Sequence, residues 1–120
     1  MEPFEAAKLA VRALDDKQGS DIRLLKTEEL TVLADYFVIC TANSTTHVRT
    51  LYDEVDKRLS MAGMPPIRRE GYRNSNWLLL DFGSLIVHIF QKETRAFYNL
   101  ERLWDDAQEI DINEIIKEEA

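Results

Sequence analysis

Cysteine, glycine and histidine are scarce in this sequence of 120 residues, and each shortage excludes a kind of site. Cys40 is the single cysteine, so an internal disulfide and a cysteine-based zinc site are both excluded. The 4 glycines form neither a dinucleotide-binding fingerprint nor a P-loop. His47 and His88 each lack a second histidine at the spacing of a metal site. We therefore expect no metal and no cofactor.

Paired carboxylates and an activated nucleophile are missing as well. No Asp-x-Asp motif occurs, although polymerase-like nucleotidyl transfer uses two carboxylates to hold paired magnesium ions. Ser84 lies outside any G-x-S-x-G elbow, and Cys40 falls within the apolar run 36–40, where core packing is the usual role. We therefore predict that the protein is not an enzyme. The alternative is a nucleotidyltransferase-like enzyme or nucleotide binder that lacks the usual carboxylates.

Long apolar runs and targeting signals are absent too. Runs such as Trp77 to Leu80 are far too short to cross a bilayer. The first residues carry neither a basic region followed by an apolar stretch nor an Arg-rich amphipathic segment. The expectation is a cytoplasmic protein that does not contact a membrane.

Charge is plentiful but unevenly distributed. The chain has 15 Lys and Arg against 22 Asp and Glu, a formal net charge of −7, which argues against a basic protein that coats nucleic acid. Residues 101–120 hold 8 acids and 2 bases and so account for −6 of that charge. We interpret residues 1–107 as one domain and residues 108–120 as an acidic tail. Positions 57–73 have a local net charge of +4, typical either of a solvated helix end or of a phosphate-binding or acid-binding surface.

Helical and strand-like patterns alternate along the chain and predict an α/β domain. Pro3 and the apolar spacing after it predict a helix over residues 3–17. A second helix is predicted between the capping residues 43–46 and Gly63. The expected strands cover residues 22–25, 35–41, 77–82 and 85–90.

The last two strands are joined by Gly83-Ser84, a pair typical of a tight hairpin turn. Because side chains alternate along a strand, one face of this hairpin is wholly apolar and must be covered by the helices. The other face is amphipathic, and the segment 97–104 is too short to cover it. We predict a two-layer mixed β-sheet with helices on one face and the other face partly open to a partner. The predicted pairs on the open face are Trp77 with Phe90, Leu79 with His88 and Asp81 with Ile86.

Several blocks of the sequence carry a recognisable pattern when they are taken together and in order. They are Asp35 to Thr41, Asn43-Ser44, His47-Val48, Glu70-Gly71, Trp77 to Gly83, Val87 to Phe90 and Arg95 to Trp104. These blocks resemble the ribosomal silencing factor family, RsfS or Iojap, and the resemblance covers residues 3–107. The resemblance implies a fold similar to that of nucleotidyltransferase domains but without the catalytic acids, in agreement with the missing Asp-x-Asp motif.

The resemblance implies a translation repressor that docks on large-subunit ribosomal protein fourteen, in the universal numbering. Docked there, it blocks joining of the small subunit in starved or stationary cells. It also implies a homodimer in the free state and no direct sequence-specific contact with nucleic acid. The implied contact residues are Trp77, Leu79, Asp81, His88, Phe90, Arg95 and Tyr98.

Physical chemistry suggests a role for each kind of contact residue. Aromatic and aliphatic side chains are the usual anchors of an interface, and Asp81 is suited to a basic protein partner. Arg95 either binds the partner or holds Asp81 in place. The remaining alternative is an RNA-binding adaptor in ribosome assembly that uses the basic positions 57–73.

Overall fold

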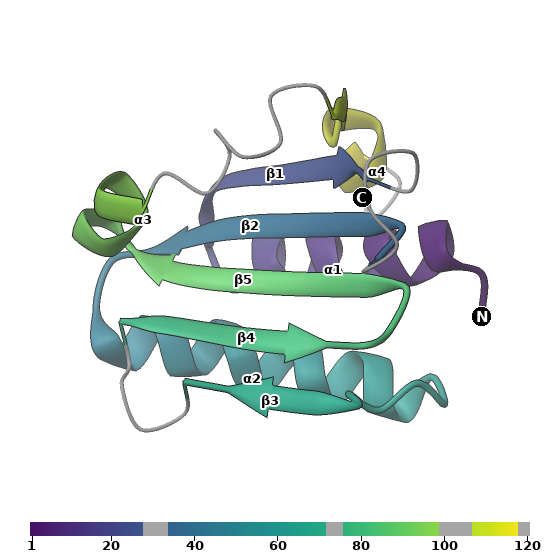
Figure 1. Ribbon diagram of the computed structural model, residues 1–120, viewed down its shortest axis with the longest axis horizontal. Coiled ribbons are helices and arrows are strands. Elements are labelled where there is room, and N and C mark those ends of the chain that lie inside the picture. The colour runs from purple at the N-terminus through teal and green to yellow at the C-terminus, as the bar shows by residue number, and fades with distance from the viewer. Residues whose placement is uncertain (28–33, 72–75, 99–106, 118–120) are drawn as a thin grey trace.

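The computed structural model describes residues 1–27, 34–71, 76–98 and 107–117, with residues 97 and 98 described by their backbone only. It contains one mixed sheet and several helices (Figure 1). Among the described residues, no helix is long and apolar enough to cross a membrane. The elements in chain order are α1 (Pro3–Asp16), β1 (Ser20–Lys26), β2 (Tyr36–Ala42), α2 (Thr45–Met61), β3 (Arg68–Glu70), β4 (Trp77–Asp81), β5 (Leu85–Gln91), α3 (Lys92–Tyr98), β6 (Gln108–Ile110) and α4 (Asn113–Lys117).

The six strands formed by the described residues are ordered β3-β4-β5-β2-β1-β6 across the sheet. β2 and β5 are parallel neighbours, and the other pairs are antiparallel. The chain leaves β2 through α2 and returns through the β3–β4 hairpin before it enters β5. The carboxyl ends of β2 and β5 therefore meet at the same edge of the sheet, where α2 begins and α3 follows.

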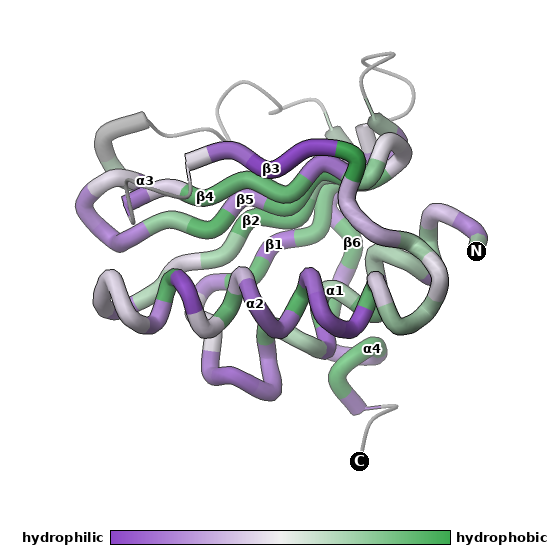
Figure 2. Tube along the Cα trace, turned by 90° about the horizontal axis from the view of Figure 1, so that it is seen from below, coloured by the Kyte–Doolittle hydropathy of each residue, from purple (hydrophilic) through white to green (hydrophobic). Residues whose placement is uncertain are grey.

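Helices α1, α2 and α4 lie on one side of the sheet, which we call the helix face (Figure 2). In β4 and β5, Leu78, Leu80, Val87 and Ile89 point to this face and are all at 0% exposure. Burial of a Leu or Ile side chain contributes roughly 1.5–3 kcal/mol each, so this layer is the main source of stability. This packing explains why apolar residues occupy every second position along β4 and β5.

Both long helices begin and end close to where the sequence predicts. Pro3 occupies the first turn of α1, and Ser44 caps α2 by accepting a hydrogen bond from the His47 backbone N–H at 3.0 Å. The His47 ring adds a second link, since its Nδ1 accepts from the Asn43 N–H at 3.0 Å and its Nε2 lies 2.8 Å from the Lys17 carbonyl oxygen. The interpretation of His47 as a residue of the helix start, rather than a metal ligand, agrees with these contacts.

The hairpin register is confirmed. Trp77 pairs with Phe90, Leu79 with His88 and Asp81 with Ile86. Gly83 has a φ of 89°, a conformation that favours glycine, and the Phe82 N–H donates to the Leu85 carbonyl at 2.8 Å. The two-layer mixed sheet with helices on one face is confirmed as well.

The segment after residue 107, expected to be an acidic tail, contributes to the folded layer. β6 pairs with β1 and forms an edge of the sheet, and α4 packs against α1, where the Ile115 carbonyl accepts a hydrogen bond from Arg12 at 3.3 Å. Ile115 itself is 4% exposed. The prediction gave too much weight to the acidic residues. The isoleucines spaced among them pack against the hydrophobic core and hold the segment to the domain.

Candidate partner-binding surface

The side of the sheet opposite the helices, which we call the open face, carries the predicted contact residues of β4 and β5. Trp77, Leu79 and Asp81 point from β4 to this side and are each partly exposed. Phe90 and His88, their partners on β5, are 0% and 5% exposed. In this chain the exposed contact groups are therefore on β4, and the two β5 residues lie beside and beneath them.

An aromatic cluster holds Trp77 in place. Its indole stacks on Phe90 with ring centroids 4.8 Å apart and an interplanar angle of 29°. Its Nε1 donates a hydrogen bond to His88 Nδ1 at 3.2 Å. His88 in turn stacks on Phe90 at 6.0 Å and lies 5.4 Å from the Phe37 ring on β2. A fixed, half-buried indole of this kind is a preorganised hydrophobic anchor.

His88 is neutral in this setting. Burial lowers the pKa of His88 from 6.5 to about 4, because an imidazolium would be stripped of water there. Since Nδ1 accepts from the indole, the ring proton lies on Nε2. The histidine is thus a packed acceptor for Trp77, and its chemistry is structural.

Asp81 has two contacts within its own hairpin. Its Oδ1 accepts the Gly83 N–H at 2.8 Å, and its Oδ2 lies 3.5 Å from Arg68 Nη2 on β3. The first contact fixes the turn, while the second is a long and partly solvated ion pair that contributes little. Asp81 is therefore held in position by the turn, and its Oδ2 faces the Arg68 guanidinium, which is also exposed to solvent.

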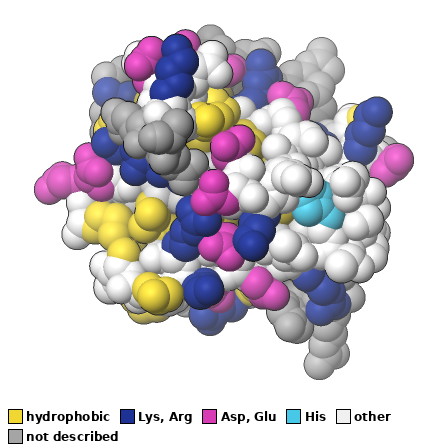
Figure 3. Space-filling model, turned by 180° about the vertical axis from the view of Figure 1, so that it is seen from behind, with side chains coloured by type: hydrophobic (Ala, Val, Ile, Leu, Met, Phe, Trp, Pro, Cys, Tyr) yellow, Lys and Arg dark blue, Asp and Glu magenta, His cyan; other side chains and the backbone are white. Residues whose placement is uncertain are grey.

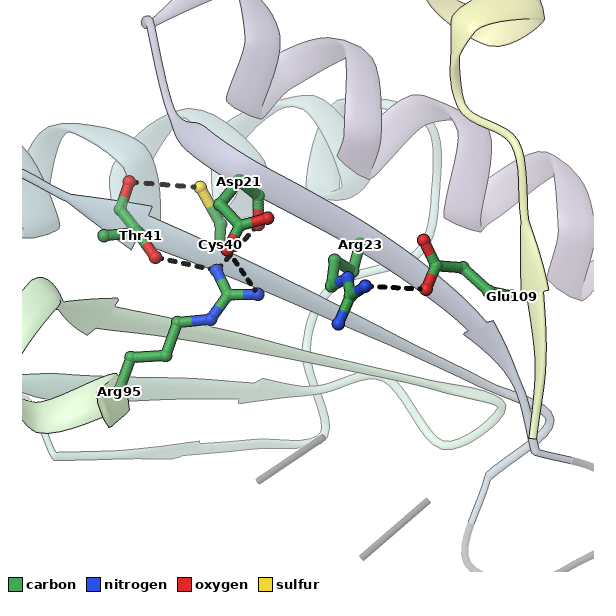
Figure 4. Close-up of polar contacts among 6 residues, drawn as sticks. All are labelled: Asp21, Arg23, Cys40, Thr41, Arg95 and Glu109. Carbon is green, nitrogen blue, oxygen red and sulfur yellow. Dashed lines mark hydrogen bonds and ion pairs between the residues drawn. The ribbon is translucent and has the colours of Figure 1, made fainter. Parts of the chain in front are cut away.

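Arg95 is 6% exposed and lies away from Asp81, at the end of the sheet where α3 begins. Its Nη1 donates to the Thr41 Oγ1 and to the Asp21 carbonyl oxygen, both at 2.7 Å, and its Nη2 is 3.4 Å from the Asp21 carboxylate (Figure 4). The suggestion that Arg95 holds Asp81 in place is wrong. Arg95 instead fastens α3 to the ends of β1 and β2.

Sequence reasoning missed Asp21 and Thr41 as the partners of Arg95. They are 74 and 54 positions away along the chain, and no local pattern relates residues at such distances. The prediction for Tyr98 concerns a side chain outside the described residues.

The basic positions 57–73 are largely matched by carboxylates. Arg58 contacts both Asp16 and Glu54, and Arg69 contacts Asp56 at 3.0 Å. Seen from the helix side, basic and acidic side chains are interspersed over the surface (Figure 3). Within the described ranges, no group of His, Cys, Asp and Glu is arranged to hold a metal ion. In the described part of this stretch, carboxylates interrupt the basic side chains that a phosphate backbone would follow.

The structure combines a rigid α/β domain with an aromatic cluster and a carboxylate on the partly exposed strand β4, while Phe37, Ile39 and Ile86 on the same side of the sheet are buried. A fixed, partly exposed indole is typical of a protein-binding surface. The comparisons identify the class more closely. The family described as "Ribosomal silencing factor during starvation" matches residues 1–120, and the chain belongs to this ribosomal silencing factor family.

Individual relatives agree with the family. The chain is similar to ribosomal silencing factor RsfS of Halalkalibacterium halodurans, with 38% identity over 116 residues that cover 97% of this chain and 99% of the relative. It is 39% identical to RsfS of Bacillus subtilis over 106 residues, which cover 88% of this chain and 90% of the relative. A crystal structure of a Chromobacterium violaceum protein has a TM-score of 0.86 and 36% identity, and the match covers 88% of each chain.

Proposed function

We propose that the protein represses translation by binding ribosomal protein fourteen of the large subunit, in the universal numbering, with its open face. Bound there, it sterically blocks association of the small subunit, especially under starvation or in stationary phase. It acts without catalysis, in the compartment where ribosomes translate, the cytoplasm. The observation that carries the proposal is the partly exposed row of Trp77, Leu79 and Asp81 on β4 in a member of the ribosomal silencing factor family.

The composition of this row suits a protein partner. Large aromatic and aliphatic groups dominate interface energies when they are fixed and become desolvated on binding. Trp77 is fixed by Phe90 and His88, so little side-chain entropy is lost when a partner covers it. Asp81 supplies a carboxylate at the opposite end of β4 from Trp77, which favours a basic partner such as a ribosomal protein.

The predicted contact residues divide into two roles in this proposal. Trp77, Leu79 and Asp81 touch the partner. Phe90 and His88 position the indole, and Arg95 positions α3 and the chain that follows it. Tyr98 remains a predicted contact. The free protein is proposed to be a homodimer, which sedimentation of the purified chain would measure.

Affinity capture from a cell extract tests the partner. Immobilised wild-type protein is expected to retain ribosomal protein fourteen, identified by mass spectrometry. Leu79→Arg, which places a cation in the middle of the row, is expected to lose it. Met61→Arg is the matched control, because Met61 is a 78% exposed apolar residue on α2, away from the open face.

Retention by Leu79→Arg equal to that by the wild type would contradict the assigned surface. Failure of the wild type to retain the ribosomal protein, even from an extract rich in free large subunits, would contradict the assigned partner. The RNA-binding alternative predicts instead that the protein binds RNA, that this binding depends steeply on the salt concentration, and that it is lost in Arg68→Glu/Arg69→Glu.

A further inference from the structure

A cavity of about 600 Å³ opens at the edge of the sheet where β2 and β5 end. Its walls come from segments far apart in the sequence: the start of β1, the loop between β2 and α2, and the first turn of α3. Ligands of open α/β sheets bind outside the carboxyl ends of parallel strands, and their sites typically measure 300–1,000 Å³. β2 and β5 are the parallel pair of this sheet, so the cavity lies at the position where the topology favours a ligand.

Among the described residues that line the cavity, Lys92 and Arg95 are cationic and Asp21 is anionic, a net charge of +1 that favours an anion. The Asp21 carboxylate lies 3.4 Å from Arg95 Nη2, so Arg95 is partly neutralised and Lys92 supplies the excess positive charge. The guanidinium of Arg95 is held by the Thr41 hydroxyl and the Asp21 carbonyl, so this positive wall is rigid and almost fully buried (Figure 4). Lys92 is exposed at the rim and adds a cation that reaches the same space. A fixed cation in a partly desolvated wall interacts with an anion more strongly than a surface cation does.

Asp21 and Asn43 add polar groups that suit a ligand with hydroxyls. Asp21 has a φ of 46°, a left-handed conformation that an L residue adopts with strain, within an irregularity of the β1–β2 ladder. Its side chain is 67% exposed, so a carboxylate is presented at the cavity mouth. Asn43 is exposed and also lines the cavity, to which Ala42 and Ala96 contribute only small side chains.

We propose that this cavity binds a small phosphomonoester of nucleotide size. The phosphate binds to Lys92 and Arg95, and sugar hydroxyls donate to the Asp21 carboxylate. A cavity of this volume is much larger than inorganic phosphate requires, so the rest of the molecule contributes to binding. The site is separate from the exposed row on β4, and no reaction is assigned to it.

One row of paired residues runs from the cavity to the open face. Thr41 at the cavity floor pairs with Phe90, and Phe90 pairs with Trp77, so the three residues form one row across β2, β5 and β4. Arg95 Nη1 bonds to the Thr41 hydroxyl at one end of this row, and the indole stacks on Phe90 at the other. A bound phosphomonoester would therefore lie two strands away from the Trp77 anchor.

Amide NMR titration of the full chain tests the site with four probes: adenosine monophosphate, ribose 5-phosphate, inorganic phosphate and uncharged adenosine. The two phosphomonoesters are expected to shift the amides of Asp21, Thr41, Asn43 and Ala96 in a saturable way. Adenosine monophosphate binding more tightly than ribose 5-phosphate would identify a nucleotide, and the reverse order a sugar phosphate. Adenosine alone is expected to give no shifts.

Lys92→Ala is expected to weaken phosphomonoester binding about tenfold or more, the effect of losing one charge-assisted hydrogen bond. Asp21→Asn is expected to weaken ribose 5-phosphate binding but not inorganic phosphate binding. Lys57→Ala, which removes an exposed lysine from α2, is the matched control and should bind like the wild type. Absence of saturable shifts at millimolar phosphomonoester, or equal weakening by Lys57→Ala, would overturn the proposal. Neither outcome bears on capture of the ribosomal protein, which is measured separately.

Discussion

The two faces of the sheet differ although they share the same strands. On β4, Leu78 and Leu80 point to the helix face and are fully buried, while Trp77, Leu79 and Asp81 point to the open face and are partly exposed. The alternation of a strand thus places the residues that hold the domain together directly beside those that we propose bind its partner. Substitutions of neighbouring residues should therefore separate stability from binding.

The largest effect is expected from leucine truncations on β4. Leu80→Ala leaves a cavity under α2 and should lower the free energy of unfolding by about 3 kcal/mol. Leu79→Ala, one residue away and partly exposed, should lower it by about 1 kcal/mol but weaken capture of the ribosomal protein. Urea unfolding and affinity capture measure the two quantities. Equal losses of stability in both variants would contradict the division between the faces.

The next largest effect is a loss of folding stability at low pH, caused by the protonation of His88 on the open face. The pKa of His88 is about 4 in the folded protein and 6.5 in the unfolded chain, so the unfolded chain takes up the proton first. The part of the folding stability that depends on a neutral His88 is fully present above pH 6.5 and is lost as the pH falls toward 4. The loss amounts to about 3 kcal/mol from 2.5 pKa units.

His88→Asn tests this pH dependence, because an amide oxygen can still accept from Trp77 and does not titrate. Urea unfolding at pH 7 and pH 4.5 should show a smaller loss in the variant than in the wild type. Carboxylates that titrate in this range are common to both proteins, so the difference isolates the histidine. Identical pH profiles would show that His88 is not the buried neutral group described above.

A smaller effect is expected from the cap of α2, which belongs to the helix face alone. Ser44→Ala removes the oxygen that accepts from the His47 N–H and should cost about 1 kcal/mol of stability. Thr46→Ala, also in the first turn but exposed, serves as the control. Both variants should capture the ribosomal protein as the wild type does under native conditions. If the fully folded Ser44→Ala variant failed to capture the ribosomal protein, a change on the helix face would affect binding at the open face. That result would contradict the separation of stability and binding between the two faces.

The smallest effect is expected on β3, where adjacent arginines point to opposite faces. Arg68 lies beside Asp81 on the open face, and Arg69 pairs with Asp56 on the helix face. Arg68→Ala leaves the Asp81 carboxylate for a basic partner and should strengthen capture about threefold, the scale of an exposed ion pair. Arg69→Ala should leave the affinity unchanged. Titration calorimetry with the purified ribosomal protein measures both, and a weaker affinity in Arg68→Ala would contradict the role of Asp81.

Local patterns were sufficient to predict α1, α2 and the β4–β5 hairpin. Glycine at a turn, capping residues and alternating apolar positions act over a few residues, and each can be read directly from the sequence. Contacts between distant segments could not be predicted in this way. The parallel pairing of β2 with β5 and the bonds of Arg95 to Asp21 and Thr41 depend on the whole topology.

The end of the chain shows a second limit. Ile110, Ile112, Ile115 and Ile116 lie among acids, and a composition argument gave more weight to the acids. The free edge of β1 provides backbone partners for β6, and α1 provides an apolar surface for Ile115. Neither is visible from the segment itself. The exposed row on β4 followed from the register, whereas the burial of Phe90 and His88 required the structure.

Subunit joining tests the central claim most directly. Purified small and large ribosomal subunits are mixed with the protein, and sucrose-gradient sedimentation measures the fraction of coupled ribosomes. The wild type and Met61→Arg are expected to sediment with the large subunit and lower that fraction, while Trp77→Ala and Leu79→Arg, shown to be folded by circular dichroism, should do neither. If the folded Trp77→Ala and Leu79→Arg variants bind the large subunit and block joining as the wild type does, the open face is not the ribosome-binding surface.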